Sequence, residues 1–152
     1  MKTKTELLLE LWLEARTRFT KQLENIQPED LLKKLGNSPN SAGFLIRHMG
    51  DVELLFAKNV FGDSTVKVVA KTVIDKYDTG EWTDLEALTR YVAESAASLQ
   101  AIVAQQNEAD WETGIITKEF GAKTKAEAFG RIVSHTAYHA GQLALIIKYG
   151  QH

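Results

Sequence analysis

Residues 132–147, "IVSHTAYHAGQLALII", decide the fold. Their apolar side chains recur at three- and four-residue steps, which is the period of an amphipathic helix with one face in a core. Two of the four histidines of the chain, His135 and His139, lie four residues apart on that same face. A buried neutral imidazole has one donor and one acceptor, and leaving either unpaired costs about 1–3 kcal/mol. The stretch therefore predicts a core helix whose histidines need partners inside the protein.

Similar periodicity predicts helices in most of the remaining chain. The four predicted helices cover about residues 4–26, 40–61, 83–106 and 124–149. Three of them begin at a capping box, in which a threonine is followed three residues later by a glutamate: Thr3 with Glu6, Thr83 with Glu86, and Thr124 with Glu127. No helix can bury its apolar stripe alone, so we expect an all-α four-helix bundle that forms a single domain over residues 1–152.

The connections after the second and third predicted helices are long and irregular. Because of their length, the helices need not follow a simple up-down-up-down order. Residues 114–121 are β-prone and begin and end with glycine, which predicts a small hairpin before the last helix. The walls of any binding pocket are expected from residues 62–82 and 107–123, where no pattern identifies a substrate.

Composition excludes several classes of protein. Apolar residues make up 44% and charged residues 25% of the chain, as in ordinary globular domains. The 18 basic and 20 acidic residues are interspersed without a basic block, so no nucleic-acid partner is expected. No apolar run approaches the length of a membrane span, and acidic residues interrupt the N-terminal stretch, which favours a cytoplasmic protein with no membrane partner. With no cysteine, the chain has neither a thiolate ligand nor a thiol nucleophile of its own.

A third histidine, His48, lies on the apolar stripe of the second predicted helix, between Leu45 and Val52. The fourth, His152, ends the chain and is expected in solvent. Three neutral imidazoles from two helices can each bond to a separate partner, or they can share one divalent cation at about 2.0–2.1 Å from each nitrogen. The residues alone leave both alternatives open.

Other catalytic templates do not fit. Zinc proteases have a glutamate directly after the first histidine of such a pair, where this chain has Thr136. The Glu-x-x-His pairs of di-iron bundles are missing, as are a phosphate-binding loop and a nucleophile elbow. We interpret Asp51 and Glu53, near His48 in sequence, as solvated helix charges, so no general base is assigned. For Tyr91 and Tyr138 the alternatives are lining a pocket and packing in the core, and we interpret both as packing aromatics.

The segments "FLIRHMGDVE" (residues 44–53) and "IVSHTAYHAGQLALI" (residues 132–146) resemble the motifs of the DinB/YfiT-like superfamily of bacterial four-helix proteins. The resemblance covers the whole chain in helix order. It implies that His48, His135 and His139 bind a divalent metal, with zinc or nickel as the usual ion. Gln142 follows the glycine of the last motif and is expected to support the ligands.

The resemblance also implies a function. Characterised relatives include thiol-dependent transferases and isomerases, and dimers are common among them, so a homodimer is a possible assembly. We therefore expect a metal-dependent enzyme acting on a small-molecule substrate, of the thiol S-transferase type, with a low-molecular-weight thiol as cosubstrate. The alternatives are a metal-dependent hydrolase and a non-catalytic, stress-related binding module with structural histidines.

Overall fold

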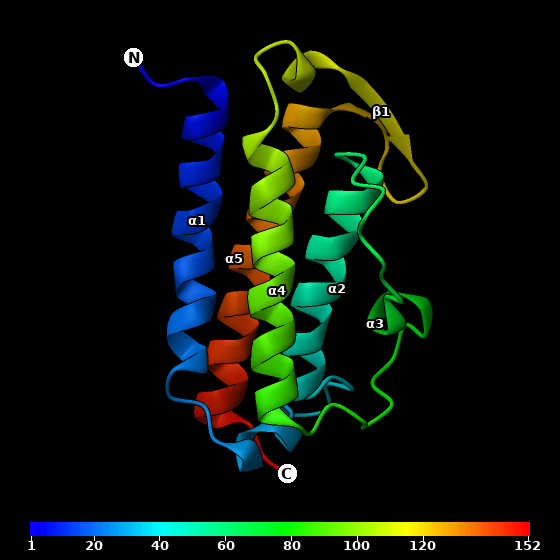
Figure 1. Ribbon diagram of the computed structural model, residues 1–152. Coiled ribbons are helices and arrows are strands. Elements are labelled where there is room, and N and C mark those ends of the chain that lie inside the picture. The colour runs from blue at the N-terminus through cyan, green and yellow to red at the C-terminus, as the bar shows by residue number, and fades with distance from the viewer.

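The computed structural model describes residues 1–152, and four long helices side by side form its body (Figure 1). These helices are α1 (Lys4–Leu23), α2 (Ala42–Asn59), α4 (Leu85–Ala104) and α5 (Lys125–Tyr149). The connections contain the 3-10 helices η1 (Pro28–Leu32) and η2 (Asp110–Glu112), the short helix α3 (Lys71–Ile74), and the strands β1 (Gly114–Thr117) and β2 (Gly121–Thr124). The predicted all-α bundle is confirmed, and the two strands pair as the expected antiparallel hairpin. None of the helices combines the length and the apolar character that crossing a bilayer requires.

The order of the helices explains the long connection between α2 and α4. In Figure 1, α1 and α5 run in one direction, whereas α2 and α4 both run in the opposite one. Since α2 and α4 are parallel neighbours, residues 60–84 must return along the length of the bundle before α4 can begin. This return segment carries α3 along the outer side of α2. The bundle is therefore not up-down-up-down, as the connection lengths indicated.

Two of the three predicted capping boxes are confirmed. The side chains of Thr3 and Thr124 each accept a hydrogen bond from the backbone three residues on, and the glutamate there bonds back to the cap. The box predicted at Thr83 is wrong, because Asp84 is the N-cap and accepts from the backbone N–H of Ala87 at 2.9 Å. Aspartate caps a helix at least as well as threonine, so the helix begins one residue later at no cost.

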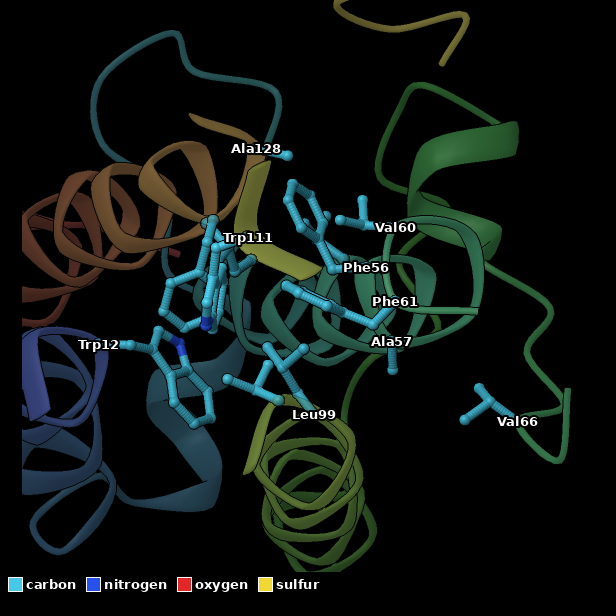
Figure 2. Packing of buried hydrophobic residues seen from close by; sticks show 13 residues of the cluster. Trp12, Phe56, Ala57, Val60, Phe61, Val66, Leu99, Trp111 and Ala128 are labelled. Atoms are coloured by element: carbon cyan, nitrogen blue, oxygen red, sulfur yellow. The ribbon is translucent and has the colours of Figure 1, made fainter. Parts of the chain in front are cut away.

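Two clusters of buried hydrophobic residues make up the core, one toward each end of the bundle. The first centres on Trp12, Trp111 and Phe129, and Figure 2 shows Trp12 close to Leu99 of α4. The Trp111 ring packs against Phe61 and Phe129, with centroids 5.8 and 5.6 Å apart. The second cluster contains Phe19, Leu31, Ile46, Met49 and Leu143. The boundary falls between Met49 and Val52 on α2 and between Ile132 and Ala140 on α5. His135 and His139 lie within this boundary on α5, and His48 lies one residue before it on α2.

A layer of buried charged residues separates the two clusters. The interpretation of Asp51 and Glu53 as solvated is wrong, because both are 0% exposed. Glu53 accepts from Arg16 Nε at 2.6 Å and from the hydroxyl of Ser95 at 2.8 Å. Burial raises the pKa of Glu53, and the charge of Arg16 opposes that rise. Arg16 lies on α1, far from Glu53 in sequence, so helix phase alone could not identify this pair.

Candidate metal centre

His48 from α2 meets His135 and His139 from α5 in the middle of the bundle. Each residue offers one ring nitrogen, and these three atoms lie within 4.8 Å of one another. The rings of His135 and His139 have centroids 4.3 Å apart, and the His48 ring is 5.1 and 5.0 Å from them. His152 is exposed at the end of the chain and takes no part. The structure thus brings together the three residues expected as ligands.

The spacing of the ring nitrogens suits a shared cation. The Nε2 atoms of His48 and His135 are 3.1 Å apart. Two imidazole nitrogens bound tetrahedrally to one cation, each at about 2.0–2.1 Å, lie about 3.3–3.4 Å from each other. A small opening of the pair is therefore enough to admit an ion. The same distance also fits a single proton shared between the two rings, so metal binding itself stays a prediction.

Hydrogen bonds at the other ring nitrogen orient two of the three histidines. His139 Nδ1 donates to Gln142 Oε1 at 2.6 Å, which is the supporting contact expected of Gln142. His48 Nδ1 lies 3.1 Å from Thr72 Oγ1, and the ring stacks on Phe44 with centroids 5.9 Å apart. Metal-binding histidines generally donate from their second nitrogen in this way. The sequence does not predict the contact of Thr72 with His48, because Thr72 lies in the connection between α2 and α4, which has no periodic pattern.

Burial keeps the three imidazoles neutral. It lowers the pKa of His48 to about 4 and that of His135 to about 3, and neighbouring histidines add to both shifts. Burial also lowers the pKa of His139, against a hydrogen bond to Gln142 that raises it. At neutral pH each ring therefore retains a nitrogen lone pair. An all-imidazole donor set without a carboxylate fits zinc, nickel or copper, whereas magnesium and calcium prefer oxygen.

A cavity of about 730 Å³ opens onto the three histidines, within the range of sites that hold small molecules. One wall comes from α2, including Val52 and Phe56, and the others come from Val73 of α3 and residues 116–120 of the hairpin. The expectation that both long connections contribute walls is therefore confirmed. Lys58 and Lys118 also line the cavity and are exposed to solvent.

A second cavity of about 350 Å³ adjoins the first and shares His135 with it. Arg131, Ser134 and Tyr138 of α5 give it a polar lining. The interpretation of Tyr138 as a packing aromatic is wrong, because this side chain is 65% exposed. Tyr91 is half-buried, and its hydroxyl donates to Asp51 at 2.6 Å, so it belongs to a polar network.

Comparisons with known proteins agree with the helical bundle. Residues 11–143 match the family model described as the DinB superfamily. The crystal structure of a DinB-like protein, YjoA from Bacillus subtilis, has a TM-score of 0.69 and 20% sequence identity, over 93% of this chain and 90% of that chain. At this identity the likeness shows a common fold. The comparison with curated proteins gave no match. Since the family model spans most of its length, this chain belongs to the DinB superfamily.

Proposed function

We propose that this protein is a metal-dependent enzyme that joins a low-molecular-weight thiol to a second small molecule. His48, His135 and His139 would hold one divalent ion, zinc or nickel. The observation that carries the proposal is the convergence of three neutral imidazoles at the wall of a cavity of about 730 Å³. Structural zinc sites use four protein ligands, whereas three protein ligands leave a position for substrate. No carboxylate completes this group of histidines.

A bound divalent cation would lower the pKa of a thiol or water in that open position and so supply a nucleophile at neutral pH. Because the chain has no cysteine, the thiol has to come from a second molecule. Two adjoining cavities, which share His135 as a lining residue, give room for two reactants beside the same histidine. This arrangement supports group transfer between two small molecules.

The cavity walls suggest the kind of molecule that fits. Val52, Phe56 and Phe120 form an apolar surface beside the histidines, which suits an apolar substrate body. Lys58 and Lys118 add positive charge to the same cavity, Arg131 adds it to the adjoining one, and Glu119 adds a negative charge to both. The larger cavity therefore has an excess of positive charge, and we infer that the reactant bound there carries a carboxylate or another anionic group.

Metal analysis tests the proposal. The protein would be purified without a histidine tag or metal-affinity resin, and its zinc and nickel content measured by mass spectrometry. We expect one ion per chain, lost in His135→Ala and His139→Ala. His152→Ala is the matched control and should keep the ion, because His152 lies outside the group.

Cobalt substitution then tests the reaction. Added low-molecular-weight thiols should change the visible spectrum of the cobalt-loaded protein. A metal that responds to no cellular thiol would instead favour the hydrolase. A metal-free protein whose melting temperature is unchanged by chelators would favour the non-catalytic binding module with structural histidines.

A further inference from the structure

A buried chain of hydrogen bonds continues behind His48. Its Nδ1 lies 3.1 Å from Thr72 Oγ1, and Thr72 Oγ1 lies 2.7 Å from Asp51 Oδ2. The backbone N–H of Thr72 donates to the same carboxylate oxygen at 3.1 Å. Asp51 is 0% and Thr72 is 4% exposed, so solvent offers these groups no alternative partner. The chain therefore links a predicted ligand on α2 to α3 and back to α2.

The number of available protons fixes the direction of these bonds. A threonine hydroxyl has one proton and a carboxylate has none. The other oxygen of Asp51 already accepts from Arg47 Nε at 2.9 Å and from the Tyr91 hydroxyl at 2.6 Å. The Thr72 hydroxyl must therefore donate to Asp51, because two oxygens 2.7 Å apart with no proton between them would repel each other. Toward His48, Thr72 Oγ1 can then only accept a hydrogen bond. The proton of that bond must therefore be on His48 Nδ1.

The surroundings of Asp51 keep it an acceptor. The guanidinium of Arg47 forms a salt bridge with it and lies over the rings of Tyr91, at 3.7 Å, and Trp82, at 4.9 Å. Burial and the hydrogen bond to Asp51 raise the pKa of Tyr91, so its hydroxyl keeps its proton. Gly50 makes room for this ring, because a Cβ there would meet Tyr91 Cε1 at 2.5 Å. The network therefore has ordered donors on both oxygens of Asp51.

We propose that Thr72 and Asp51 are positioning residues that hold His48 in its Nδ1–H tautomer, with the Nε2 lone pair directed at the other two histidines. The inference rests on the proposed function, in which Nε2 is the ligand atom. A free histidine ring prefers the Nε2–H tautomer, whose proton would occupy that atom, and a hydrogen bond at the other nitrogen reverses the preference. Gln142 likewise accepts from Nδ1 of His139 and so favours the Nδ1–H tautomer of that ring.

The tautomer can be measured in metal-free protein. Long-range proton–nitrogen correlation spectra of protein with ¹⁵N-labelled histidine, recorded at pH 7, report which ring nitrogen carries the proton. We expect His48 of the wild type to be protonated at Nδ1. Thr72→Val keeps the shape and the backbone bond to Asp51 but removes the hydroxyl, and it should shift His48 toward Nε2–H. Thr72→Ser should restore the wild-type spectrum.

Zinc affinity, measured by competition with a chromophoric chelator, provides the second readout. Thr72→Val should weaken zinc binding by about 10–100-fold, the usual effect of removing a group that orients a ligand. Thr72→Ser should bind close to wild type. Tyr91→Phe is the matched control: it removes a hydrogen bond to the other oxygen of Asp51 and should leave the tautomer of His48 unchanged.

Either of two results would overturn the inference: a wild-type His48 protonated at Nε2, or a Thr72→Val variant with the tautomer and zinc affinity of the wild type. The two proposals fail separately. A wild-type protein that binds neither zinc nor nickel would remove the proposed function, whereas the tautomers of the metal-free protein would still decide whether Thr72 positions His48.

Discussion

Zinc binding by this protein should resist acid to an unusual degree. A histidine binds metal only when neutral, so protons compete for the site at pH values below the pKa of the ring. Burial lowers the pKa of His48 to about 4 and that of His135 to about 3, and it lowers the pKa of His139 as well. Competition from protons should therefore begin at a lower pH than it does for exposed histidines.

The size of the difference follows from the neutral fractions at pH 5.5. A ring with the ordinary pKa of about 6.5 is then only about 9% neutral, and three such rings together would weaken binding about 1,000-fold relative to pH 7.5. In this site His48 and His135 stay almost fully neutral at pH 5.5. His139, with its pKa below the ordinary value, limits the total loss to less than about tenfold.

Calorimetric or competition titrations with zinc at pH 7.5, 6.5 and 5.5, in buffers that do not bind metal, would measure this dependence. His152→Ala should titrate identically, which removes the exposed tail as a source of the signal. A fall in affinity of about three orders of magnitude across this range would refute the reasoning, because it would mean that the histidines titrate as solvated rings.

Three further predictions concern stability. Arg16→Met should lower the free energy of unfolding, measured with urea, by about 3–5 kcal/mol, because it leaves Glu53 buried and unpaired; Lys2→Met, which breaks an exposed ion pair, should cost less than about 1 kcal/mol. Acidification should destabilise the metal-free protein as the pH falls from about 6.5 to about 4, because His48 takes up a proton in this range in the unfolded chain but stays neutral in the folded one. Thermal melts should therefore show a steeper pH dependence for the wild type than for His48→Gln. Zinc at 100 times its dissociation constant should stabilise the wild type by about 2.7 kcal/mol and leave the melting temperature of His135→Ala unchanged.

The sequence was sufficient to predict the helices and the histidine cluster, because both depend on local periodicity. Caps and apolar stripes act over three or four residues, so the predicted helix starts agree with the structure to within two residues, even where Asp84 and not Thr83 is the cap. His135 and His139 share a face by their spacing, and His48 lies on the stripe of its own helix. The bundle then needed only to bring two inward faces together.

The polar groups around the histidines depend on contacts between distant segments, and the sequence could not supply them. The sequence indicates solvated charges at Asp51 and Glu53, yet both are buried and form ion pairs with Arg47 and Arg16. The position of a residue in the helical period predicts the direction of its side chain, but it does not predict which charged side chain will form an ion pair with it. Thr72 lies in a connection without periodicity, so only the structure shows that it reaches His48.

X-ray absorption spectroscopy of the zinc-loaded protein tests the central claim most directly. The expected result is one zinc per chain with three imidazole nitrogens at about 2.0–2.1 Å from it, and His135→Ala should bind no zinc. A zinc environment made of oxygen ligands, or one with a single imidazole, would contradict it, because the ion would then lie outside the place where α2 and α5 bring His48, His135 and His139 together.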